Sequence, residues 1–268
     1  MRTWQLADKV RSNKPRILHI ANTVAAAFSD AGLRALGARS WLSVNEAEIE
    51  ELVTLSQALV INLGSLQGKA LSTMLNAGKA ANRAGIPVVL DPVGVGAISA
   101  RRQQVKILLQ EIRFSLIRGN AGELAQLAGI TWRAKGVDAG SGTADLFHIT
   151  QEVARRYGCV ALLSGATDII ADENHLVTLQ NGSAMFPKVT ASGCLFSAVC
   201  AAFLAVSDGR YFSACVEACA VYIVAGELAA QDLQPSQYGE FSLALLDRLA
   251  SIDSAQVAQK LNITIIQE

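Results

Sequence analysis

A turn of small residues, Thr-Ala-Ser-Gly-Cys at 190–194, precedes an apolar run that continues to Val206. The first N–H groups of a helix lack intrahelical partners and carry the positive end of its dipole, so this turn could bind a phosphate. Helix starts also favour thiolates, and Cys194 could accept a proton from a substrate hydroxyl. The structural alternative is that Ser192 is an ordinary N-cap and Cys194 packs in the core.

A carboxylate ends another apolar run, in the string Asp-Pro-Val-Gly-Val-Gly at 91–96. The two glycines would let the backbone approach a ligand closely. Asp91 could then orient a cation, or its water shell, near phosphates. It could equally cap the turn that follows, as Asp before Pro often does.

A third string, Arg-Gly-Asn-Ala-Gly-Glu at 118–123, also follows an apolar run. The forked donors of Arg118 suit phosphate oxygens. Glu123 falls early in the next helix, where the dipole alone favours a carboxylate, and Arg118 could simply pair with it. The density of the string favours a function.

Short apolar runs and longer helical stretches alternate along the chain and must position these strings. Runs that are apolar throughout are typical of strands buried on both faces, as in a parallel sheet. The alternation predicts an α/β fold, a three-layer αβα sandwich with a mostly parallel central sheet. The expected strands are 16–20, 58–63, 87–90, 115–117 and 159–163; the expected helices are 23–36, 47–56, 71–84, 101–111, 121–127 and 144–157. Ligands of such sheets bind beyond the carboxyl ends of the strands, which here means 62–65, 91–96, 118–123 and 164–165.

The pattern changes near Thr167, where short β-rich runs are separated by turns. We expect a small antiparallel extension at one edge of the sheet, with strands 167–171, 175–178 and 184–187. Apolar helices should follow between 193 and 230, then a loop and a last helix at 240–249. With no linker or repeat in the sequence, we predict one domain over residues 1–268.

Composition excludes several classes of protein. The 268 residues are 51% apolar and 17% charged with a net charge of zero, and they hold no basic run, so we expect no nucleic-acid partner. The first residues hold no apolar signal core and the apolar runs fit buried helices, so we expect no membrane association. Five cysteines, an odd number, favour reduced thiols and a cytoplasmic location.

Together the strings resemble the hydroxyethylthiazole kinase family of the ribokinase-like superfamily. Nearly the whole chain is covered, and the strings that follow Asp91 and Ile117 are the most specific. The matching segments are 35–38, 58–64, 85–97, 117–123, 135–138, 188–190 and 193–194. The resemblance implies ATP-dependent phosphorylation of the primary alcohol of 4-methyl-5-(2-hydroxyethyl)thiazole in thiamine salvage, by in-line transfer.

The resemblance also implies roles for single residues. Asp91 and Glu123 would hold Mg²⁺, and Cys194 would be the catalytic base. The residues expected to contact ATP are Arg118, Asn120, Ser164 and Gly193; those expected near the thiazole are Asn22, Val24, Leu42, Gly64, Ser65 and Ala191. The family usually forms homotrimers with pockets at subunit boundaries.

Departures from the family pattern are found mainly in the part of the site expected to bind the alcohol, which we call the alcohol side. Ala191 and Ser192 replace a usual Gly-Thr, Arg39 and Trp41 alter a usual Ser-Pro-x-Met that ends here in Leu42, and a usual His is Leu18. These changes leave two alternatives: a kinase of a different small primary alcohol, or a non-catalytic ligand-binding paralogue. A dehydratase on the same fold would share ATP binding, but no string favours it.

Overall fold

The computed structural model describes residues 4–20, 23–64, 70–135, 138–142 and 145–267. Asn22 and Ser65, two of the residues expected near the thiazole, lie outside these ranges. All other residues named above for the site are described.

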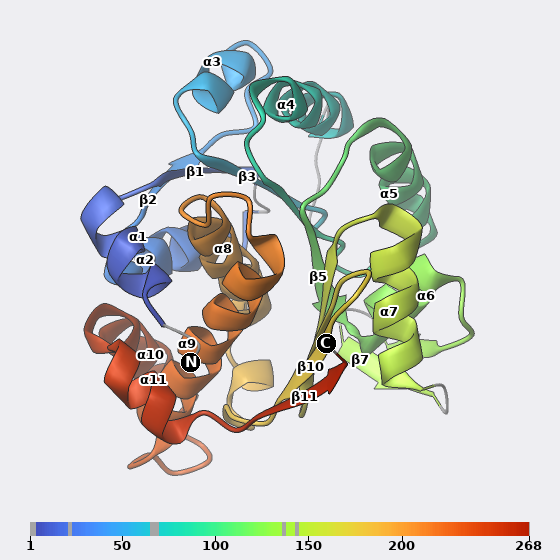
Figure 1. Cartoon of the computed structure of the whole chain (residues 1–268). Coiled ribbons are helices and arrows are strands. Elements are labelled where there is room, and N and C mark those ends of the chain that lie inside the picture. The colour runs from blue at the N-terminus through green and yellow to red at the C-terminus, as the bar shows by residue number, and fades with distance from the viewer. Residues whose placement is uncertain (1–3, 21–22, 65–69, 136–137, 143–144, 268) are drawn as a thin grey trace.

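A nine-stranded sheet forms the middle layer, in the order β11-β10-β9-β8-β5-β4-β3-β1-β2 (Figure 1). Six neighbouring strands are parallel: β2 (Arg39–Leu42), β1 (Arg16–Ile20), β3 (Ala58–Asn62), β4 (Val88–Asp91), β5 (Leu116–Asn120) and β8 (Val160–Ser164). The antiparallel edge consists of β9 (Asp168–Ala171), β10 (Leu176–Leu179) and β11 (Ile263–Gln267). A mostly parallel sheet with an antiparallel edge is therefore confirmed.

Helices cover both faces of the sheet, which confirms the three-layer prediction (Figure 1). Alternate residues of each central strand join opposite cores; in β1, Ile17 faces one core and Leu18 the other. One core packs against α1 (Leu6–Asn13), α2 (Ala26–Leu36), α8 (Ser192–Leu204), α9 (Tyr211–Ala230), α10 (Tyr238–Ser251) and α11 (Ser254–Lys260). The other packs against α3 (Ile49–Thr54), α4 (Ala70–Ala84), α5 (Ser99–Glu111), α6 (Ala121–Ala128) and α7 (Leu146–Tyr157).

The expected strand at 184–187 is wrong. This segment forms a turn and the 3-10 helix η1 (Phe186–Lys188), and the N–H of Met185 donates to Oγ of Ser183 at 3.1 Å. Pro187 has no N–H to give to a sheet, which favours the 3-10 turn. The place beside β10 is taken instead by β11, from the far end of the chain.

The sequence analysis did not predict helices α1 and α11, and the helix expected at 240–249 is not the last one, because α11 follows it. It also missed four short strands. β2 is an edge strand whose residues are mostly exposed, and it therefore lacks the apolar run by which a buried strand is predicted. β11 is exposed in the same way. A small hairpin, β6 (Arg133–Lys135) with β7 (Asp138–Ser141), lies outside the main sheet. Short strands such as these carry little hydrophobic periodicity.

Helix α9 is long and apolar enough to span a membrane by length and composition alone. However, 78% of its most apolar window is buried inside the protein, where it packs against α8 and α10. Glu217 on this helix accepts hydrogen bonds from the N–H groups of Leu6 and Ala7, at 2.6 and 3.3 Å, and so anchors α1. These contacts make α9 a core helix, as its sequence predicts.

Candidate active site

A cavity of about 1550 Å³ opens where β4, β5 and β8 end beneath the start of α8. These strands are neighbours in the sheet and finish at Asp91, Asn120 and Ser164, so their end residues converge on one edge. Arg118, Glu123, Gly193 and Cys194 line the same cavity. The three strings identified in the sequence therefore meet at one site.

Helix α8 begins over this cavity with an unusual backbone. Ala191 is its N-cap residue and has φ 67° and ψ 7°, a left-handed conformation that costs a residue with a side chain about 1–2 kcal/mol. The interpretation of Ser192 as the N-cap is therefore wrong: its Oγ donates to the carbonyl of Phe186 at 2.7 Å. The turn that should bind phosphate is held in a conformation that glycine adopts freely.

Arg118 joins the strand ends to this turn. Its Nη1 donates to the carbonyl oxygen of Gly193 at 3.0 Å and its Nη2 to Oγ of Ser164 at 2.6 Å. The guanidinium carbon lies 5.0 Å from the centre of the Phe196 ring. A Cβ at position 193 would come within 2.8 Å of Nη1, so Gly193 leaves the room that Arg118 needs. The guanidinium is thus placed by contacts with two elements, α8 and β8, and its Nε is buried without a hydrogen-bond partner in the structure.

Glu123 ties the 91–96 loop to helix α6. Its Oε1 accepts the N–H of Gly94 and its Oε2 that of Asn120, both at 2.8 Å, while Oδ1 of Asn120 accepts the N–H of Glu123 at 3.0 Å. Burial, with help from Asp91, raises the pKa of Glu123 to about 7, although the two N–H groups act in the opposite direction. Glu123 is therefore part of a capping box and also a buried carboxyl beside a second one.

Asp91 is 1% exposed and is held by side chains around it. Its Oδ2 accepts from Nδ2 of Asn62 at 2.8 Å. Burial raises the pKa of Asp91, while Arg118 and hydrogen bonds from Ser197, Asn62 and Cys194 oppose that rise. The carboxyl of Asp91 and the thiol of Cys194 are thus in contact beneath the α8 turn.

The residues present fit a magnesium ion that is shared with phosphates. Within the described ranges, no group of three or more His, Cys, Asp and Glu side chains could hold a metal unaided. Mg²⁺, however, keeps waters and binds through one or two carboxylates plus substrate phosphates. Burial is the largest cause of the raised pKa of both Asp91 and Glu123, and one guanidinium, that of Arg118, opposes the rise in each. A divalent cation at this place would supply the missing positive charge.

The residues expected near the thiazole fall into two groups. Val24, Gly64 and Ala191 line the cavity, next to the α8 turn. Leu42 lies in the edge strand β2, is 41% exposed, and is not among the residues that line the cavity of the single chain. One chain therefore brings together the phosphate side of the site more completely than the alcohol side.

Two further residues of the cavity were not singled out from the sequence. Asp168 is buried, its Oδ1 accepts the N–H of Gly165 at 3.2 Å, and burial raises its pKa to about 7. The signal in the sequence is that Asp168, a carboxylic acid, begins the apolar run that follows Ser164. Tyr222 donates its hydroxyl to the carbonyl of Ser192 at 2.7 Å, but it is one residue among many on an apolar helix.

Known proteins are similar to this chain over almost its whole length. Hydroxyethylthiazole kinase of Haemophilus influenzae is 58% identical over 253 residues, which cover 94% of this chain and 95% of the relative. The solved hydroxyethylthiazole kinase of Pyrococcus horikoshii is 28% identical and superposes with a TM-score of 0.89 over 98% of both chains. Pyridoxal kinase of Bacillus subtilis, 15% identical with a TM-score of 0.62 over 84% of this chain and 95% of that one, shares the fold. A model of the hydroxyethylthiazole kinase family matches residues 7–255, and the chain belongs to that family.

Proposed function

We propose that the protein is a single ribokinase-like kinase domain, over residues 1–268, that transfers the γ-phosphoryl group of ATP to a thiazole alcohol. The acceptor is the primary hydroxyl of 4-methyl-5-(2-hydroxyethyl)thiazole, and the reaction serves thiamine salvage. The observation that carries this proposal is the convergence of Arg118, Asp91 and Glu123 beneath the start of α8 in one cavity. A guanidinium, two carboxylates and the N–H groups at the start of a helix are the groups that phosphoryl transfer requires.

Each residue has a role in the transfer. Arg118 and Ser164, joined by a 2.6 Å hydrogen bond, bind the phosphates of ATP, with Asn120 and Gly193 beside them. The alcohol oxygen bonds to the γ-phosphorus as the bond to the β–γ bridging oxygen breaks, and ADP leaves. The hydroxyl proton passes to Cys194, the proposed base, which lines the cavity in the first turn of α8.

Cys194→Ser tests the base. We expect turnover to fall at least about tenfold, because a hydroxyl is a far weaker base than a thiolate and general-base contributions are of this order or larger. Full turnover in Cys194→Ser would show that the proton goes elsewhere.

Asp91 and Glu123 would hold Mg²⁺ between them and the phosphates. The ion, when bound, offsets negative charge on the phosphate oxygens. Glu123→Gln keeps the size of the side chain and should raise the Mg²⁺ concentration for half-maximal activity by about 10–100-fold. Glu111→Gln, which changes a surface carboxylate paired with Lys79, is the matched control. An unchanged magnesium dependence in Glu123→Gln would contradict the metal role.

The alcohol side supports a proposal about assembly. Val24, Trp41 and Leu42 are large apolar residues exposed at the carboxyl ends of β1 and β2 or just beyond them. We propose that they are covered at a subunit boundary in a homotrimer, so that Leu42 completes the thiazole pocket. Light scattering coupled to gel filtration measures the mass directly; a monomer would contradict this proposal and leave the kinase chemistry untouched.

The experiment that tests the function is ADP release measured with and without the thiazole alcohol. Release that depends on this alcohol supports the proposal. The altered residues Arg39 and Trp41 favour a second candidate, a kinase of another small primary alcohol, and a panel of pyrimidine and sugar alcohols in the same assay would identify it. Binding of the thiazole alcohol without ADP release would instead indicate a non-catalytic paralogue. No disulfide joins any of the five cysteines, all of which the structure describes; this supports a cytoplasmic location, and cell fractionation would test it.

A further inference from the structure

We propose that Tyr222 is a positioning residue that aims the backbone N–H groups of the α8 turn at the transferring phosphoryl group. Tyr222 comes from the middle of α9, is 2% exposed and borders the cavity. Its hydroxyl donates to the carbonyl oxygen of Ser192 at 2.7 Å. The inference rests on the proposed function. It adds to that function a residue that does not touch the substrates and acts through the backbone of α8.

The planarity of the peptide bond explains how a bond to a carbonyl can aim an N–H. The carbonyl of Ser192 and the N–H of Gly193 belong to one rigid trans peptide and point in opposite directions. Tyr222, by fixing the carbonyl, fixes the direction of the Gly193 N–H. Arg118 does the same one residue later, because its bond to the Gly193 carbonyl fixes the Cys194 N–H. Tyr222 and Arg118, from separate elements, thus fix two consecutive peptide planes through hydrogen bonds to their carbonyl oxygens.

The start of α8 has no side-chain cap, which is also true of α1, α2, α3, α5, α9 and α10, but of these N-cap residues only that of α8 is left-handed. Helices α6 and α11 begin with capping boxes at Asn120 and Asp253, and Asp145 caps α7. The N-cap of α8 is Ala191, which has no side-chain oxygen and sits in the left-handed region. Without a cap, the orientation of the first peptide planes depends on contacts from other elements.

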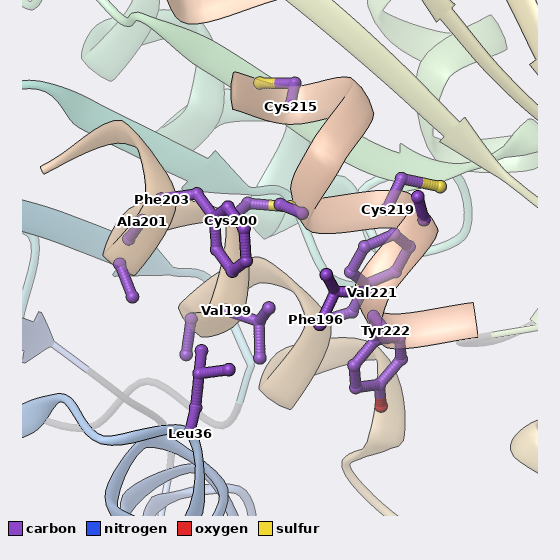
Figure 2. Close-up of a cluster of buried hydrophobic side chains, with 14 of the residues drawn as sticks. Leu36, Phe196, Val199, Cys200, Ala201, Phe203, Cys215, Cys219, Val221 and Tyr222 are labelled. Carbon is purple, nitrogen blue, oxygen red and sulfur yellow. The ribbon is translucent and has the colours of Figure 1, made fainter. Parts of the chain in front are cut away.

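The ring of Tyr222 is itself stacked against two other rings, which restrict the position of its hydroxyl. The ring centre of Phe196 lies 4.6 Å from that of Tyr222, and the ring centre of Phe186 lies 5.0 Å from it. In Figure 2 the ring of Tyr222 lies beside Phe196, and its hydroxyl oxygen points away from the buried cluster. Phe186 packs directly on the backbone of α9, since a Cβ at Gly226 would come within 2.1 Å of its ring. The hydroxyl is therefore preorganised, which is what electrostatic catalysis requires of its supports.

Tyr222→Phe tests the inference because it removes one oxygen and keeps the stacked ring. Loss of a direct oxyanion donor costs 10²–10³ in turnover, so loss of the group that aims one should lower kcat about tenfold. The KM values for ATP and for the alcohol should stay within about twofold, because ground-state contacts are unchanged. The matched control is Tyr157→Phe, which removes a hydroxyl bonded to the carbonyl of Leu127 at 3.1 Å beside the other core; Tyr157 does not line the cavity.

A second measurement separates positioning from general loosening. We expect Tyr222→Phe to bind ADP as wild type does, and ADP with aluminium fluoride, which imitates the transferring group, about tenfold more weakly. A thermal melt beside Tyr157→Phe checks that the variant is folded. Phe186→Leu, which frees one face of the ring and keeps the hydroxyl, should show a smaller loss of kcat in the same direction.

The outcomes distinguish the inference from the function on which it rests. Equal kcat in Tyr222→Phe and Tyr157→Phe, or equal weakening of ADP and ADP–aluminium fluoride, would overturn the role of Tyr222 while leaving the kinase intact. Wild-type protein that releases no ADP with any alcohol would overturn the function. The ADP–aluminium fluoride comparison would still test Tyr222 in that case, because it needs an anion at the turn and no acceptor.

Discussion

The phosphate side and the alcohol side of the cavity differ in how the fold holds them. Asp91, Arg118 and Glu123 are at most 9% exposed, and each is bonded to partners from other elements. Val24 and Leu42, on the alcohol side, are 59% and 41% exposed at an edge of the sheet. A buried group with several partners cannot change without leaving one of them unsatisfied, whereas an exposed edge can. Of the departures from the family pattern, Arg39 and Trp41 lie on this exposed edge, whereas Leu18 and Ser192 are buried.

Arg118→Lys should give the largest effect and tests the phosphate side directly. Lys cannot donate from a rigid fork to Ser164, to the Gly193 carbonyl and to phosphate together, so we expect kcat/KM to fall about 10²–10³-fold. Steady-state ADP release measures it. Arg156→Lys is the control, because Arg156 bonds to the carbonyl of Leu127 and to Glu152 on a different face. A loss below about threefold would show that the buried network is not rate-determining.

The sequence was sufficient to predict the buried half of this comparison. Asp91, Arg118 and Glu123 follow strands that are apolar throughout, and a parallel sheet must bring such ends together. The six parallel strands, apart from β2, and the helices between them were predicted for the same reason. The observed boundaries differ from the predicted ones by a few residues where a capping residue sets the start of a helix. The helix predicted at 144–157 begins at Leu146, because the side chain of Asp145 accepts the N–H of Phe147.

Other features depended on contacts between distant residues. β11 pairs with β10 across more than 80 residues, and nothing in its own exposed sequence indicates the partner. The role of Tyr222 depends on a carbonyl 30 residues away, and an apolar helix gives no signal for one hydroxyl among its buried residues. The segment 184–187 looked like a strand locally, but Pro187 and the turn at Ser183 favour a 3-10 helix.

Asp168→Asn tests what burial of a carboxyl beside the cavity costs in stability, through its effect on the pH dependence of unfolding. Burial raises the pKa of Asp168 from 3.8 to about 7, so between these values the folded protein keeps a proton that the unfolded chain has lost. The free energy of unfolding should therefore decrease as pH rises through this window, by at most about 1.4 kcal/mol per pH unit for one group. Asn removes this dependence and can still accept the N–H of Gly165.

Urea unfolding of metal-free protein at several pH values between 4 and 7 measures the slope. Glu123, whose pKa is raised to about 7 mainly by burial, has the same sign and remains in the variant. We therefore expect the slope to become smaller in Asp168→Asn without vanishing. Asp247→Asn, on the surface of α10, should leave the slope as it is in wild type. Identical slopes in wild type and Asp168→Asn would mean that Asp168 is ionised in the folded protein throughout this range.

Leu42→Ala tests the exposed side, with a smaller expected effect. If Leu42 completes the pocket at a subunit boundary, the variant should raise the KM for the alcohol about tenfold and leave the KM for ATP unchanged, since about 1–3 kcal/mol is typical for lost apolar contact in a pocket. Leu243→Ala, which truncates an exposed leucine on α10, is the control. A rise in the KM for ATP instead would show that Leu42 affects the phosphate side of the cavity, which would contradict its assignment to the alcohol side.

Ala191→Gly should give the smallest effect, at the residue where the two sides meet. Relief of the left-handed strain outweighs the entropy cost of glycine, so we expect a gain of roughly 0.5–1 kcal/mol in the free energy of unfolding. The control is Ala205→Gly at the other end of α8, where φ is −59° and glycine should destabilise by a similar amount. Turnover should change little, because Tyr222 and Arg118 hold the turn in both proteins. Opposite signs at positions 191 and 205 would show that the turn is strained where phosphate binds, and a loss at both positions would show that Ala191 is unstrained.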